Sequence, residues 1–193
     1  MKTVFLIASG AITIIAALPY LNDVLKHQTK PRIVSWFNWT LLTGIATAAA
    51  LAAKQYPSAV LTGAACVETI VIVIAGFHLG DKKFEKFDVL CQFGAIIGLI
   101  LWIIFNSPLV AIIATVTIDF IAGLPTWKHA WESPDEETSS TFVLSAIGSG
   151  FALLALRRPH VSGLLYPIFI TLSTVIVIVL LALSPHRHAS RKS

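Results

Sequence analysis

The sequence has few charged residues, and this shortage excludes most classes of protein. Only 12% of its 193 residues are Asp, Glu, Lys or Arg, whereas a soluble globular protein has roughly 25%. So few charges cannot cover the surface of a soluble domain. Because 56% of the residues are hydrophobic, the chain is not intrinsically disordered. The same numbers exclude a nucleic-acid-binding protein with a basic face.

Cysteine is equally scarce. The only two, Cys66 and Cys91, lie within apolar runs, which excludes a disulfide-rich scaffold. We expect both to be buried thiols rather than a disulfide or a metal site. We therefore expect neither a metal nor a cofactor.

Charge is absent from long segments, and these segments determine the class. A bilayer core about 30 Å thick needs about 20 apolar residues in a helix that rises 1.5 Å per residue. The sequence therefore predicts a membrane protein that crosses the bilayer several times. The segments without Asp, Glu, Lys or Arg are 3–22, 33–53, 89–118, 138–156 and 159–186.

Prolines, glycines and polar runs divide these segments into seven predicted transmembrane helices. Ser58 is predicted to cap the third helix, and Asn106-Ser107-Pro108 is a turn in which Ser caps the fifth. We expect an all-α fold. The predicted helices are 3–25, 33–53, 58–79, 87–105, 108–131, 139–156 and 163–184.

An offset of 106 residues aligns helices 1–3 with helices 5–7. It pairs Pro19 with Pro125 and Gly44 with Gly150, which chance matches between apolar residues do not explain. Helix 4 has no partner, so we expect a 3+1+3 arrangement of two parallel repeats. The predicted parts are a first repeat with its loop (1–86), a linker helix (87–106), a second repeat (107–185) and a tail (186–193).

Lysine and arginine are distributed unequally between the two predicted ends of the helices. One end carries 4 of them and the other carries 10, which accounts for all 14. By the positive-inside rule, the N-terminus faces out and the C-terminus faces the cytoplasm. Because the loops are very short, we expect the cell (inner) membrane of a prokaryote. Anionic lipid would attract the basic tail.

Two segments resemble the SWEET and PQ-loop superfamily. The first is Leu18-Pro-Tyr-Leu-Asn-Asp-Val-Leu25, which continues through Thr29-Lys-Pro-Arg32 to Ser35-Trp-Phe-Asn-Trp39; the second is Asp119-Phe-Ile-Ala-Gly-Leu-Pro-Thr-Trp127. The resemblance implies alternating-access transport of sugars, amino acids or related solutes, with the prolines as hinges. The family's glutamine after each motif proline is absent, and helices 3 and 7 lack the asparagine with which sugar carriers hold their substrate.

Glu68 and Asp119 are the only acidic residues deep inside apolar segments. An ionised carboxylate at the bilayer centre costs on the order of 3 kcal/mol or more, so such residues usually bind a substrate or proton or join helices. We expect Asp119, six residues before Pro125, to be the stronger candidate. The offset pairs Asp119 with Thr13 and Glu68 with Thr174, which favours one asymmetric site. Thr174 is also a candidate for binding the substrate or proton.

Other residues of the candidate site lie at the start of the second helix. Trp36 and Trp39 share one face by their i, i+3 spacing, either as substrate contacts or as an interfacial aromatic belt. Asn38 could bind substrate or a neighbouring helix. Pro19 and Pro125 each remove an intrahelical hydrogen bond, so they are either hinges or ordinary helix ends.

We therefore predict a small-solute transporter, either a uniporter or proton-coupled, with its solute near the midplane between the repeats. A retinal protein needs a lysine inside helix 7 to form its Schiff base. No lysine lies between Lys128 and Lys192, so this class is excluded. No cluster of ligands suggests an enzyme. A vitamin-precursor carrier would need aromatic-rich helices 3–6, and only Trp102 and Phe105 approach this. The alternative is a non-transporting membrane receptor or scaffold on the same fold.

Overall fold

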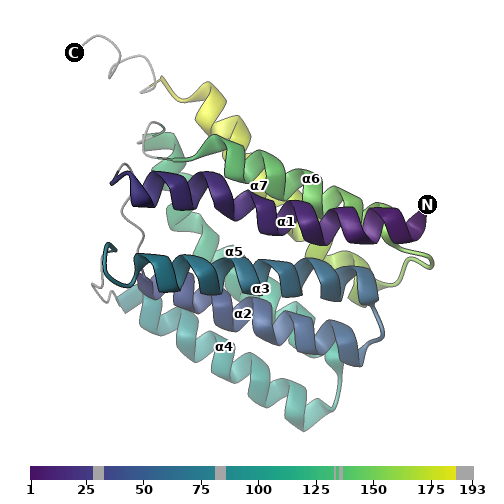
Figure 1. The fold of residues 1–193 in the computed structure, drawn as a ribbon. Coiled ribbons are helices and arrows are strands. Elements are labelled where there is room, and N and C mark those ends of the chain that lie inside the picture. Colours follow the sequence, from purple (N-terminus) through teal and green to yellow (C-terminus); the bar gives the residue numbers. More distant parts are fainter. Residues whose placement is uncertain (28–32, 81–85, 133, 135–136, 186–193) are drawn as a thin grey trace.

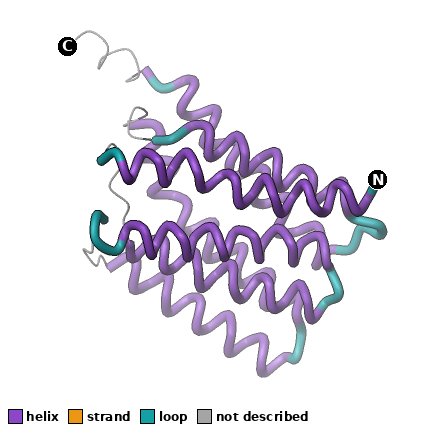
Figure 2. The backbone as a smooth tube through the Cα atoms, in the orientation of Figure 1, coloured by secondary structure: helices purple, strands orange, loops and turns teal. Residues whose placement is uncertain are grey.

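Seven helices make up the described part of the chain, which contains no strand (Figures 1 and 2). The computed structural model describes residues 1–27, 33–80, 86–132, 134 and 137–185, without the side chains of residues 87, 88, 125 and 129. The helices are α1 (Lys2–Leu25), α2 (Ile33–Ala52), α3 (Tyr56–Gly76), α4 (Lys86–Phe105), α5 (Pro108–Glu132), α6 (Ser139–Ala155) and α7 (Val161–Leu183).

The third helix begins earlier than the sequence predicts, so the prediction of Ser58 as its N-cap is wrong. Gln55 is the N-cap, and Pro57 lies in the first turn of α3. Proline is tolerated there because the first N–H groups of a helix have no intrahelical partner. Lys54, with a φ of 56°, makes the left-handed turn that separates α2 from α3.

Five of the seven helices are long and apolar enough to cross a membrane. These are α1, α2, α3, α5 and α7, and each has 20 or more residues. The other two helices offer shorter apolar stretches, Val89–Phe105 in α4 and the whole of α6. The 17 residues of α6 rise only about 26 Å, slightly less than a bilayer core of about 30 Å.

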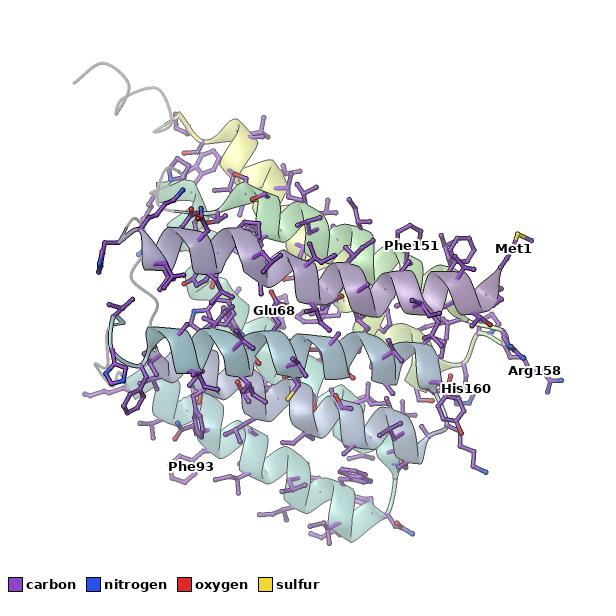
Figure 3. All side chains as sticks on the ribbon, in the orientation of Figure 1. Met1, Glu68, Phe93, Phe151, Arg158 and His160 are labelled. Atoms are coloured by element: carbon purple, nitrogen blue, oxygen red, sulfur yellow. The ribbon has the colours of Figure 1, made fainter. Side chains whose placement is uncertain are left out.

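Successive helices run in alternating directions, so two sets of loops gather at opposite ends of the bundle (Figure 1). The N-terminus shares one end with the α2–α3, α4–α5 and α6–α7 connections. We call this the N-terminal face. The side chains of Arg158 and His160 lie at this end with Met1 (Figure 3).

Neighbouring helices are often distant in sequence. Helix α3 contacts both α1 and α2, and α7 contacts both α5 and α6. Helix α1 also lies along α6, and α2 lies along α5. Helix α4 packs on α5 and α2 at the edge of the bundle. The candidate residues on α2, α5 and α7 can therefore meet.

Small residues allow the close approach of several helices. A Cβ added to Gly148 of α6 would lie 2.7 Å from Thr13 Oγ1 of α1, and one added to Gly98 of α4 would lie 2.9 Å from Ala114 Cβ of α5. The α1–α6 pair is also joined by the stacked rings of Phe5 and Phe151, 5.7 Å apart. Glycine at such positions is typical of helix packing in membranes.

Burial repeats along the chain at the offset of 106 residues. On the first two helices of each predicted repeat, eight register positions are buried in both copies, whether their side chains are apolar or polar, while others, such as Ala16/Ala122 and Ile33/Ser139, are buried in one copy only. The pairs buried in both copies are Ser9/Thr115, Thr13/Asp119, Val24/Ala130, Leu42/Gly148, Thr43/Ser149, Ala46/Ala152, Ala49/Ala155 and Ala50/Leu156.

Candidate functional site

Asp119 is buried in the centre of the bundle, where three helices meet. It shares the inward stripe of α5 with Ile112 and Thr115, and only 8% of its surface is exposed. The hydroxyl of Tyr166 on α7 donates a hydrogen bond to Asp119 Oδ2 at 3.2 Å. The indole N–H of Trp39 on α2 is its second hydrogen-bond donor. One carboxyl group thus connects α2, α5 and α7.

The sequence analysis missed Tyr166, although it is the most deeply buried large side chain of the site, with 1% exposed. A buried tyrosine needs a partner for its hydroxyl, and Asp119 supplies it. The thiol of Cys66 lies near Tyr166 and approaches the Thr40 carbonyl oxygen at 3.7 Å. The signal that the sequence offered is that Tyr166 is the single tyrosine within the charge-free segment 159–186.

No basic side chain compensates the charge of this carboxyl within the apolar segments. Lys, Arg and His are absent from 33–53, 89–127 and 138–156 in the sequence. An ionised carboxylate only accepts hydrogen bonds, whereas a protonated one also donates. With two donors from the protein, Asp119 can bind a proton or a donor group of a solute through its remaining lone pairs.

Three aromatic side chains, Trp39, Trp36 and Tyr20, lie in succession from Asp119 towards the end of the bundle that is opposite the N-terminal face. The Trp36 and Trp39 rings meet edge to face with centroids 5.0 Å apart. Tyr20, directly after Pro19, lies 4.9 Å from Trp36, and the Trp36 Nε1–H donates to its hydroxyl at 3.1 Å. The two tryptophans therefore form part of a packed cluster with α1.

Glu68 is buried to the same degree as Asp119, with 8% exposed, but in a different place. It shares the inward stripe of α3 with Leu61, Ala64 and Ile72, and Figure 3 shows it between the ribbons of α3 and α1. Within the described ranges its carboxyl forms no hydrogen bond or ion pair. The two predicted acidic residues thus do not form one hydrogen-bonded pair.

The remaining predicted residues are Asn38, Thr174 and the two prolines. Asn38 is buried on α2. The Thr174 hydroxyl donates to the Ile170 carbonyl of its own helix at 2.7 Å. Pro19 lies inside α1, and Pro125 lies within α5, with a side chain outside the described set. A further in-helix proline, Pro167, directly follows Tyr166 on α7.

A cavity of about 370 Å³ opens at the N-terminal face, over the same three helices. It combines apolar side chains with the polar groups of Gln55, Ser107, His160 and Ser162. The His160 Nδ1 accepts a hydrogen bond from the Ser162 backbone N–H and thereby caps α7. Its other lining residues are Ala52, Ala53, Pro108 and Leu109.

The chain was compared with protein-family models, curated proteins and solved structures. None of the three comparisons finds a match.

Proposed function

We propose that the protein is a small-solute transporter of the cell membrane that works by alternating access, as a uniporter or coupled to protons. The observation that carries this proposal is the position of Asp119. Its partners Tyr166 and Trp39 come from α7 and α2, so the site joins residues 1–86 to residues 107–185. Relative motion of these two parts would change its surroundings.

The pattern of neighbouring helices supports the 3+1+3 arrangement on which this mechanism depends. Exchanging α1, α2 and α3 for α5, α6 and α7 converts the pairs α1–α3, α2–α3 and α1–α6 into α5–α7, α6–α7 and α2–α5, which also contact one another. The matching burial at the offset of 106 residues points in the same direction. Such parallel repeats occur in known transporters, with binding sites between them near the midplane.

The distribution of Lys and Arg supports an orientation with the N-terminus outside. In the sequence, the predicted loops divide the basic residues 4 to 10 between the two ends. Lys2, Lys54, Arg157 and Arg158 belong to the N-terminal face, and Lys26, Lys86 and Lys128 belong to the opposite end. The other 7 lie outside the described residues. This excess favours a cytoplasmic position for the second end. Asp119 would then exchange protons or solute with both sides in turn.

The alternative is a receptor or scaffold with the same fold. A buried acidic residue can simply join helices, and the Tyr166–Asp119 hydrogen bond would do so. The unpartnered carboxyl of Glu68, within the described residues, favours transport because a purely structural role gives no reason to retain it at such cost.

Counterflow in proteoliposomes tests the proposal. A labelled panel of sugars, amino acids and vitamin precursors is offered to the wild type, Asp119→Asn and Glu132→Gln, with and without a pH gradient. Glu132 is the control because it is exposed at the end of the same helix and pairs with Lys128 at the surface. We expect exchange of one solute by the wild type and the control, and its loss in Asp119→Asn.

Three other outcomes separate the possibilities. If Asp119→Asn keeps both the exchange rate and its pH dependence, Asp119 has no role in coupling. If exchange is unaffected by protons in all variants, the protein is a uniporter. If folded wild-type protein exchanges nothing in the panel, the receptor or scaffold function is favoured.

A further inference from the structure

The cavity at the N-terminal face and the Asp119 site lie along the same three helices. On α5 the order is Ser107–Leu109 at the cavity, then Ala111 and Ile112, then Asp119. On α7 it is His160 and Ser162, then Leu165, then Tyr166. On α2, Ala52 and Ala53 line the cavity, Ala49 follows, and Trp39 lies deeper.

The intermediate level is a closely packed apolar layer. Its centre consists of Ala49, Ala111 and Ile112, which are at most 1% exposed, and partly buried Leu165 and Val116 pack against it. Ile112 has the largest side chain of these three. It precedes Asp119 by seven residues on the same stripe, which corresponds to about 10 Å of helix. The layer therefore separates the cavity from the carboxyl.

We infer that the cavity is the vestibule through which the solute reaches Asp119, and that Ile112 is the main barrier between them. The inference rests on the proposed transport function and specifies its route. An apolar constriction without room for water blocks ions and polar solutes, because they would lose their hydrogen bonds there. Movement of α2 away from α5 would open the layer.

The cavity also indicates the kind of solute. About 370 Å³ is near the lower limit of ligand pockets, which are roughly 300–1,000 Å³. Its wall offers an amide at Gln55, a hydroxyl at Ser107 and the imidazole of His160 beside apolar Leu109. These groups suit a small polar metabolite that both donates and accepts hydrogen bonds.

Cys66 can report opening of the layer without any transport assay. It is half-buried beside Tyr166, on the far side of the layer from the cavity. In a Cys91→Ala background, the probe is a membrane-impermeant trimethylammonium-ethyl methanethiosulfonate, added to each membrane face in turn. A further variant, Ser107→Cys, identifies the face from which the cavity is reached.

The decisive comparison is between two neighbouring isoleucines. Ile112→Ala removes the barrier, whereas Ile113→Ala makes the same change on a side chain that is 47% exposed on the outside of the bundle. From the face that labels Ser107→Cys, we expect Cys66 to react at least tenfold faster in Ile112→Ala and at the wild-type rate in Ile113→Ala. Ile112→Val should give an intermediate rate, and it replaces Ile112→Ala if that variant does not fold.

The inference is overturned if the two alanine variants label Cys66 equally, or if labelling accelerates only from the opposite face. Its failure is distinguishable from failure of the transport function. Exchange of a solute without faster labelling retains the transporter and rejects this route. Faster labelling without any exchange retains the water-accessible route and rejects the transporter.

Discussion

The contact between α1 and α6 leads to a prediction with a control on the same helix. Gly148→Ala places a Cβ 2.7 Å from Thr13 Oγ1 and 3.4 Å from both the Ser9 carbonyl oxygen and the Thr13 nitrogen. Gly150→Ala, two residues further, places a Cβ with nothing within 4 Å. The two substitutions are chemically identical and differ only in what the new methyl group meets.

The expected magnitude follows from two opposing effects. In a helix interior, replacing glycine with alanine stabilises by roughly 0.5–1 kcal/mol. Overpacking a filled interface costs roughly 1–3 kcal/mol. Relief by rotation of Thr13 would break its hydrogen bond to the Ser9 carbonyl, which is 2.9 Å long. We therefore expect Gly148→Ala to be less stable than Gly150→Ala by about 1–3 kcal/mol.

Thermal unfolding of the purified protein in detergent measures this difference. At roughly 2–4 °C per kcal/mol for chains of 150–250 residues, the Tm of Gly148→Ala should be lower than that of Gly150→Ala by at least about 2 °C. Gly150→Ala should match or exceed the wild type. Equal Tm values for the two variants would refute the close packing of α1 against α6 at this point.

Three further changes test other parts of the bundle. Tyr166→Phe removes one of the two donors to Asp119 and should slow solute counterflow by about 10- to 150-fold, since a hydrogen bond to a charged group contributes about 1.5–3 kcal/mol; an unchanged rate would exclude this bond from the transport cycle. Pro19→Ala restores an intrahelical hydrogen bond, so Tm should rise while the exchange rate falls, and a rate equal to the wild type would contradict the hinge. Thr138→Val removes the hydroxyl that donates to Asp23 Oδ2 at 2.6 Å and should lower Tm by the equivalent of about 1 kcal/mol, whereas an unaltered Tm would contradict a stabilising contact between α1 and the start of α6.

The helices were largely predictable because charges and prolines interrupt the apolar segments at their ends. The first, second, fourth, fifth and sixth helices differ from the prediction by one residue at most at either end. The largest differences are at α3 and α7. Helix α3 ends three residues before the predicted end, and turns that contain Gln55 and His160 begin each of the two helices two residues early. Those caps depend on backbone geometry and side-chain contacts that residue type alone does not indicate.

The candidate site was only partly predictable. Asp119 stands out because a carboxyl in an apolar run is rare. Trp39 stands out because it shares a helix face with Trp36 near the start of α2. Their contact could not be predicted, since the sequence does not indicate that α2 lies along α5. Tyr166 was missed because one tyrosine in an apolar segment resembles an interfacial residue. The cavity is formed by turns about 50 residues apart in sequence, so no local pattern marks it.

The contacts between α1 and α6 determine which helices can separate. The pair is joined at one end by Lys2 Nζ, which donates to the Leu154 carbonyl at 2.6 Å, and near the other end by Thr138 and Asp23. Between these points lies the close approach at Gly148. The corresponding pair, α2 and α5, meets through small side chains such as Ala49 and Ala111. Opening of the bundle would therefore separate α2 from α5 and leave α1 and α6 joined. The inferred route to Asp119 would then form between α2 and α5.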